Sequence, residues 1–123
     1  MLKKFILSLT AIMVLSLVVI AQGGNATLEG YIVDKSCSMK DAKEADPQAA
    51  AANETKSCIL MESCLKSGLG VYSGGKYIQF DQKGVALAKA ALEKSAKDKG
   101  AKFKVTGKVT GDKIAVENIE EVE

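Results

Sequence analysis

The chain has 123 residues, 17 of them basic and 15 acidic, and it contains neither histidine nor tryptophan. Every basic residue is a lysine. The lack of histidine removes the commonest general base and the commonest transition-metal ligand, so a Ser-His-Asp or Cys-His catalyst cannot form from this chain alone. We therefore predict a protein that is not an enzyme and that needs no cofactor.

The first 26 residues have the pattern of an export signal. Lys3 and Lys4 precede an apolar run over residues 5–20, which is short for a membrane span of about 20 residues. Small residues follow, and cleavage is possible after Ala21 or after Ala26. We predict a signal peptide over 1–26, a single domain over 27–123, a periplasmic or secreted location, and contact with a membrane only during export.

Loss of the signal leaves 15 lysines against 15 acidic residues, so the mature chain has no net charge. Nucleic-acid binding needs a positively charged face, and arginine is the usual side chain for bidentate phosphate contacts. Nucleic acid is therefore not expected as a partner.

The first part of the mature chain predicts one strand followed by a long connection. Residues 27–33 are rich in strand-forming side chains. Residues 34–56 are polar and rich in alanine, which indicates a solvated loop with at most a short helical turn. Residues 57–67 have helical spacing of apolar residues, and Gly68 is a natural end for that helix.

The second part predicts two hairpins with a helix between them. Gly74-Gly75 suits a tight turn, and Asp81 suits a helix N-cap. Ile119 lies one place out of the alternating pattern, which indicates a bulge or the end of the last strand. The predicted elements are strands over 69–72 and 77–80, a helix over 82–97, a strand over 103–109, a turn over 110–113 and a last strand from residue 114.

This order of elements predicts a mainly β, α+β domain with two helices. Five strands with a helix between the third and the fourth is the order of an OB-like Greek-key barrel. The unusual part is a cysteine-bearing helical insertion between the first two strands, because this connection contains all three cysteines: Cys37, Cys58 and Cys64.

The export signal indicates an oxidising location, where the cysteines are disulfide candidates. On a continuous helix Cys58 and Cys64 would be about 9 Å apart along the axis, beyond the disulfide limit of about 7 Å between Cα atoms. Unless the helix breaks, Cys37 should pair with one of them. Cys64 is favoured because it lies close to the start of the second strand.

The leading functional hypothesis is an exported binding or structural module of the cell envelope, stabilised by one disulfide. Its partner would be a small molecule or an envelope protein. OB barrels usually bind ligands near the loops between strands 1 and 2 and strands 4 and 5. The predicted lining residues are therefore Ser36, Ser38, Met39 and Lys113.

The alternative hypothesis is a thiol-redox or soft-metal protein. Thiolate and thioether sulfur atoms suit Cu(I) and related ions. Such an ion could be bound by the sulfur atoms of Cys37, Cys58, Met61 and Cys64 together. The leading hypothesis assigns no metal site.

Three segments resemble small exported bacterial proteins of unknown function with an OB-like fold. They are Gly30-Tyr31-Ile32-Val33-Asp34 with Cys37, Cys58-Ile59-Leu60-Met61 with Cys64, and residues 105–116. The resemblance implies a periplasmic or secreted domain with no assigned reaction. Such proteins often have a histidine shortly before the second cysteine, where this chain has Glu54-Thr55-Lys56. That difference counts against a metal site.

Overall fold

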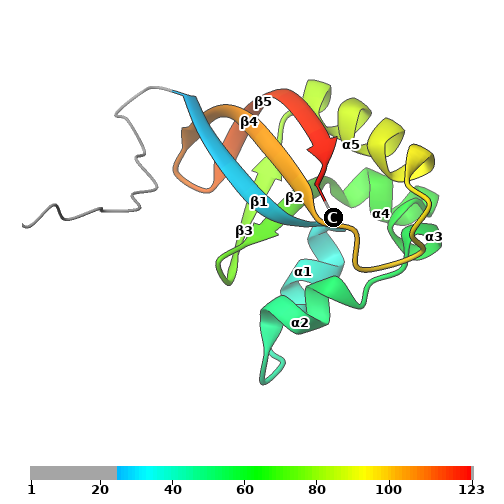
Figure 1. Ribbon diagram of the computed structural model, residues 1–123. Coiled ribbons are helices and arrows are strands. Elements are labelled where there is room, and N and C mark those ends of the chain that lie inside the picture. Colours follow the sequence, from blue (N-terminus) through cyan, green and yellow to red (C-terminus); the bar gives the residue numbers. More distant parts are fainter. Residues whose placement is uncertain (1–24, 123) are drawn as a thin grey trace, which may run out of the picture.

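The computed structural model describes residues 25–122. Within this range the protein is a mixed α+β domain with a five-stranded sheet and five helices (Figure 1). The predicted signal residues 1–24 lie outside the described residues. The elements are β1 (Asn25–Asp34), α1 (Lys35–Asp41), α2 (Pro47–Ala52), α3 (Lys56–Ile59), α4 (Glu62–Ser67), β2 (Leu69–Ser73), β3 (Lys76–Phe80), α5 (Gln82–Lys94), β4 (Phe103–Thr110) and β5 (Lys113–Glu121).

The pairing of the strands closes on itself in the order β1-β2-β3-β5-β4. The first half of β1 pairs with β4 and its second half pairs with β2, both antiparallel. Gly30 lies where β1 changes partners, and a Cβ atom there would overlap the carbonyl oxygen of Tyr72. Strands β3 and β5 are parallel and pair at only two positions, Gln79 with Lys113 and Phe80 with Ile114.

A single large hydrophobic core lies inside this sheet. It includes Leu69, Val71, Phe103, Val105 and Ile114, each with at most 1% of its surface exposed. Helix α5 packs against β2, β3 and β5. Its N-cap is Asp81, as predicted, because the carboxylate accepts a hydrogen bond from the Gly84 amide.

The last strand contains the irregularity that the sequence predicted, two residues earlier than Ile119. Thr106 pairs with Asn118 and Gly107 with Val116, so Glu117 is an extra residue between them. This β-bulge bends β5 without ending it, and the strand continues to Glu121.

The connection between β1 and β2 differs most from the sequence prediction. It contains four short helices rather than one helix and a loop, and these lie together at one side of the sheet (Figure 1). The helix predicted over 57–67 is broken, because Met61 has extended backbone angles and starts α4 as its N-cap. The core contacts here come from Ile59 of α3 and Leu65 of α4, whereas Met61 between the two helices is 54% exposed.

Two smaller corrections concern the ends of elements. Helix α5 ends at Lys94 rather than at residue 97, because Ser95 already has extended backbone angles. The first strand covers Asn25–Asp34 rather than residues 27–33, since Asn25 and Ala26 already pair with Lys108 and Gly107.

Candidate functional site

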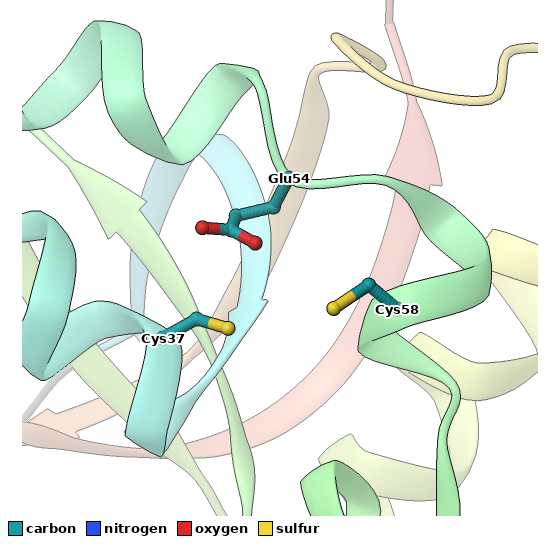
Figure 2. A group of neighbouring side chains, drawn as sticks. All are labelled: Cys37, Glu54 and Cys58. Atoms are coloured by element: carbon teal, nitrogen blue, oxygen red, sulfur yellow. The ribbon is translucent and has the colours of Figure 1, made fainter.

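Two cysteines and a glutamate meet inside the long connection. The sulfur atoms of Cys37 and Cys58 and a carboxylate oxygen of Glu54 all lie within 4.8 Å of one another. Figure 2 shows the three side chains converging from α1, from the segment between α2 and α3, and from α3. All three residues are partly buried. We call this group the Cys-Glu-Cys site.

The local sequence positions both cysteines in the same way. Asp34 caps α1 and Thr55 caps α3, and each cap accepts a hydrogen bond from the amide of the cysteine three residues later. The distances are 3.1 Å from Cys37 N to Asp34 Oδ2 and 3.3 Å from Cys58 N to Thr55 Oγ1. Each cysteine is therefore fixed in the first turn of a capped helix.

Glu54 reaches the site because α2 ends just before it. Its amide donates to the carbonyl oxygen of Ala51, which is 2% exposed. The Glu54 side chain is itself only 11% exposed, and Lys40 Nζ lies 3.9 Å from its Oε1 atom. The glutamate is thus held in place from both its backbone and its carboxylate.

The surroundings of the cysteines are strongly acidic. Burial raises the pKa of the Cys37 thiol, and the negative charges of Asp34 and Glu54 raise it further. Burial and the Asp34 carboxylate likewise raise the pKa of Cys64. In the absence of a cation these two thiols stay protonated at neutral pH. Reactive redox cysteines have lowered pKa values, so this environment does not favour thiol exchange.

The donor set fits a metal ion. Zinc is bound by cysteine sulfur at about 2.3 Å and by carboxylate oxygen at about 2.0–2.2 Å, so two ligands of one ion lie about 3.3–3.8 Å apart. Atoms within 4.8 Å of one another need to move by little more than 1 Å to reach that spacing. A bound cation would also favour the thiolate form and offset the acidic surroundings.

Other residues predicted for the cysteine chemistry lie outside this site. None of the three cysteines forms a disulfide, and the predicted Cys37–Cys64 pair is absent. Cys64 is partly buried on α4 and is not in the Cys-Glu-Cys site. Met61 is 54% exposed between α3 and α4. The argument for Cys64 rested on its nearness to the start of β2, and that nearness does not bring it into the Cys-Glu-Cys site.

The residues predicted to line a ligand site do not share one pocket. Ser36, Ser38 and Met39 are on α1, where the Ser38 hydroxyl is buried and donates to the Lys35 carbonyl, and Met39 is 61% exposed. Lys113 begins β5 and lines a pocket of about 340 Å³ that includes no α1 residue.

Sequence reasoning missed Glu54 as a site residue and treated it as evidence against a metal site. The available signal was its closeness to Cys58, four residues along the chain, although Glu54 lies before the N-cap of α3 and so does not share a helix with Cys58. Its meeting with Cys37 depends on the packing of α1 against α2, which the sequence does not reveal.

Comparison with known proteins gives no relative: no family model matches the chain, and no curated protein or solved structure is significantly similar to it. Among the described residues, no helix is long and apolar enough to cross a membrane. Function must therefore be inferred from the site's own residues.

Proposed function

We propose that this protein is a small exported module that binds a transition-metal ion at the Cys-Glu-Cys site. The observation that carries the proposal is the convergence of Cys37, Glu54 and Cys58 within 4.8 Å from three separate segments. Two cysteine sulfurs and one carboxylate are donors that zinc accepts, and the raised pKa of Cys37 does not favour redox exchange. The protein has no catalytic role in this proposal.

The exported location remains part of the proposal and rests on the lysine pair and apolar run of residues 1–26. We further propose that the closed sheet is an OB-like Greek-key barrel, which the strand order and the helix between β3 and β4 support. In this arrangement the barrel is the scaffold, and the helical connection between β1 and β2 holds the ion.

The test is a titration of the reduced, metal-free protein with Co²⁺, which replaces zinc and has absorption bands that report thiolate ligands. We expect one ion per chain and a sulfur-to-cobalt charge-transfer band. Cys37→Ser and Cys58→Ser should each remove most of this band. Cys64→Ser is the matched control, since it makes the same change outside the site. Absence of a thiolate band in the unaltered protein would refute the proposal.

A second candidate function is the binding of a small molecule at the pocket beside Lys113. Lys108 and Lys113 outnumber the single carboxylate in the lining, Asp81, whose Oδ1 atom already accepts hydrogen bonds from two backbone amides. The methyl groups of Thr110 and Ala115 add apolar surface, so a small anion with an apolar part would fit. Chemical-shift changes confined to these residues on addition of a short fatty acid such as octanoate would support it. Equal shifts after Lys113→Gln would count against it.

A further inference from the structure

Glu54 gives the proposed site a property that two cysteines alone would lack. Building on the proposed function, we propose that Glu54 makes the site selective for a divalent ion of the zinc class over a monovalent ion of the copper class. This choice of ion differs from the copper-type site that pooled sulfur atoms would form.

The first argument is charge. Two thiolates and one carboxylate carry three negative charges, so a monovalent ion would leave two of them uncompensated and a divalent ion would leave one. The ammonium group of Lys40 lies 3.9 Å from Glu54 and can offset that one. The fully buried carboxylate of Asp34 borders the site and makes a further excess of negative charge still more costly.

The second argument is the chemistry of the donors. Carboxylate oxygen is a normal ligand of zinc, whereas Cu(I) prefers thiolate and thioether sulfur. A site for a soft monovalent ion would be better served by more sulfur. Cys64 is nearby in the sequence, yet it does not belong to the group of atoms within 4.8 Å. Met61, also nearby in the sequence, is 54% exposed. The position next to the two sulfur atoms is occupied by an oxygen donor instead.

The third argument is that the Glu54 carboxylate is already held beside the two sulfur atoms before an ion binds, unlike a carboxylate on the exposed surface. Its side chain is 11% exposed, and Figure 2 shows one of its carboxylate oxygen atoms turned toward the two sulfur atoms. For comparison, the side chain of Glu62 on α4 is 84% exposed and pairs with Lys66, its neighbour four residues on. Glu62 therefore provides a matched control for any change made at Glu54.

The experiment measures Zn²⁺ and Ag⁺ affinity in parallel, with Ag⁺ as an air-stable monovalent ion that favours sulfur. Both are measured by competition on the full exported chain, for the unaltered protein, Glu54→Gln and Glu62→Gln. We expect Glu54→Gln to weaken Zn²⁺ binding by about tenfold or more, in the range seen when support for a metal site is lost. Its Ag⁺ affinity should change by less than about threefold, and Glu62→Gln should change neither.

The outcomes separate the two proposals. If the unaltered protein binds neither ion, the proposed metal-binding function fails and this inference fails with it. If it binds both ions and Glu54→Gln weakens neither, or weakens both equally, the metal site stands and the role of Glu54 is overturned. If Glu54→Gln does not fold, Glu54→Asp is used instead. It keeps the negative charge, but its side chain is one methylene shorter, so the carboxylate oxygen lies farther from the sulfur atoms. Zn²⁺ affinity should then still fall relative to Ag⁺ affinity.

Discussion

The carboxyl group of Asp41, at the end of α1, faces that of Glu54 inside the long connection. Asp41 is only 2% exposed, and its Oδ2 atom has no hydrogen-bond partner in the described structure. Burial and the neighbouring negative charge of Glu54 raise the pKa of Asp41 to about 6. The metal-free protein therefore keeps two acidic groups together at a cost in stability.

The first prediction concerns this pair. A carboxyl group whose pKa is raised by folding does not affect the free energy of unfolding at pH values below its pKa in the unfolded chain. It lowers that free energy progressively as pH rises from the unfolded pKa to the folded pKa. The metal-free protein should lose stability between about pH 4 and pH 6 through this group. Asp41→Asn should remove that loss and raise the free energy of unfolding at pH 7 by about 1–3 kcal/mol. Urea unfolding in the presence of a chelator at several pH values measures this.

The control for Asp41→Asn is Asp112→Asn, which makes the same change in an exposed turn. This control should leave the pH dependence of stability as it is. If the free energy of unfolding changed with pH in the same way for the unaltered protein and for Asp41→Asn, the prediction would be contradicted.

The second prediction concerns Asp34, whose pKa shifts in the opposite direction. Burial alone would raise its pKa, but hydrogen bonds from the Ser36 hydroxyl and the Cys37 amide outweigh burial and lower it. Asp34 therefore stabilises the fold above its ordinary pKa of 3.8, and this stabilisation is lost as pH falls through the folded value. Asp34→Ala should cost about 1–3 kcal/mol at pH 7.

At pH 3 the difference between the unaltered protein and Asp34→Ala should be smaller. Asp34→Asn retains an oxygen that can accept the Cys37 amide, so we expect it to recover part of the loss. Thermal unfolding of the three proteins at pH 7 and pH 3 makes the comparison. An Asp34→Asn variant that is no more stable than Asp34→Ala would show that capping is not the cause.

The third prediction concerns Gly30. Any side chain at this position would overlap the backbone oxygen of Tyr72, which cannot move without disturbing β2. Gly30→Ala should therefore cost more than about 3 kcal/mol or prevent folding. Gly74→Ala is the control, because that position has a φ of +58° but no atom lies within 4 Å of the place that a Cβ atom would take. Its cost should be about 1–2 kcal/mol from backbone strain alone, as measured by urea unfolding.

Patterns that depend on neighbouring residues were predictable from the sequence. Alternation revealed the strands, the cap at Asp81 revealed the start of α5, and Ile119 revealed the bulge to within two residues. The break at Met61 was not predictable, because no glycine or proline marks it and apolar residues continue on both sides of it.

The candidate site was predictable only in part. The sequence singled out the cysteines as disulfide candidates or metal ligands and favoured Cys64 as the partner of Cys37, whereas the cysteine that lies beside Cys37 is Cys58. Glu54 and Cys37 are 17 positions apart and meet only after α1 packs on α2. No periodic pattern encodes a contact of this kind.

The fourth prediction concerns the start of the exported protein. Cleavage after Ala26 would remove Asn25 and Ala26, which pair with β4, and Ala26 is only 4% exposed. Cleavage after Ala21 would keep both residues in the strand. We therefore expect the exported protein to begin at Gln22, as measured by intact mass. A chain that begins at Thr27 should be less stable by about 1 kcal/mol or more. A natural product beginning at Thr27 would contradict this.

The fifth prediction concerns the disulfide that forms when no metal is bound. The raised pKa of Cys37 makes thiol exchange slow, but the sulfur atoms of Cys37 and Cys58 lie within 4.8 Å. We therefore expect prolonged treatment with oxidised glutathione to join these two residues rather than Cys37 and Cys64. The closed loop of about 20 residues would stabilise the metal-free fold by about 3 kcal/mol in the chain-entropy model. Saturating Zn²⁺ should prevent oxidation, since both sulfur atoms are then ligands.

Peptide mapping can assign this disulfide if the protease is chosen carefully. Trypsin alone leaves Cys58 and Cys64 on one peptide, because there is no lysine between Lys56 and Lys66. Additional cleavage after Glu62 separates them. Cys64→Ser should form the same disulfide as the unaltered protein, whereas Cys58→Ser should not form it. A bridge from Cys37 to Cys64 in the unaltered protein would mean that the α3–α4 segment rearranges in the oxidised state, and the Cys-Glu-Cys geometry would then not describe that state.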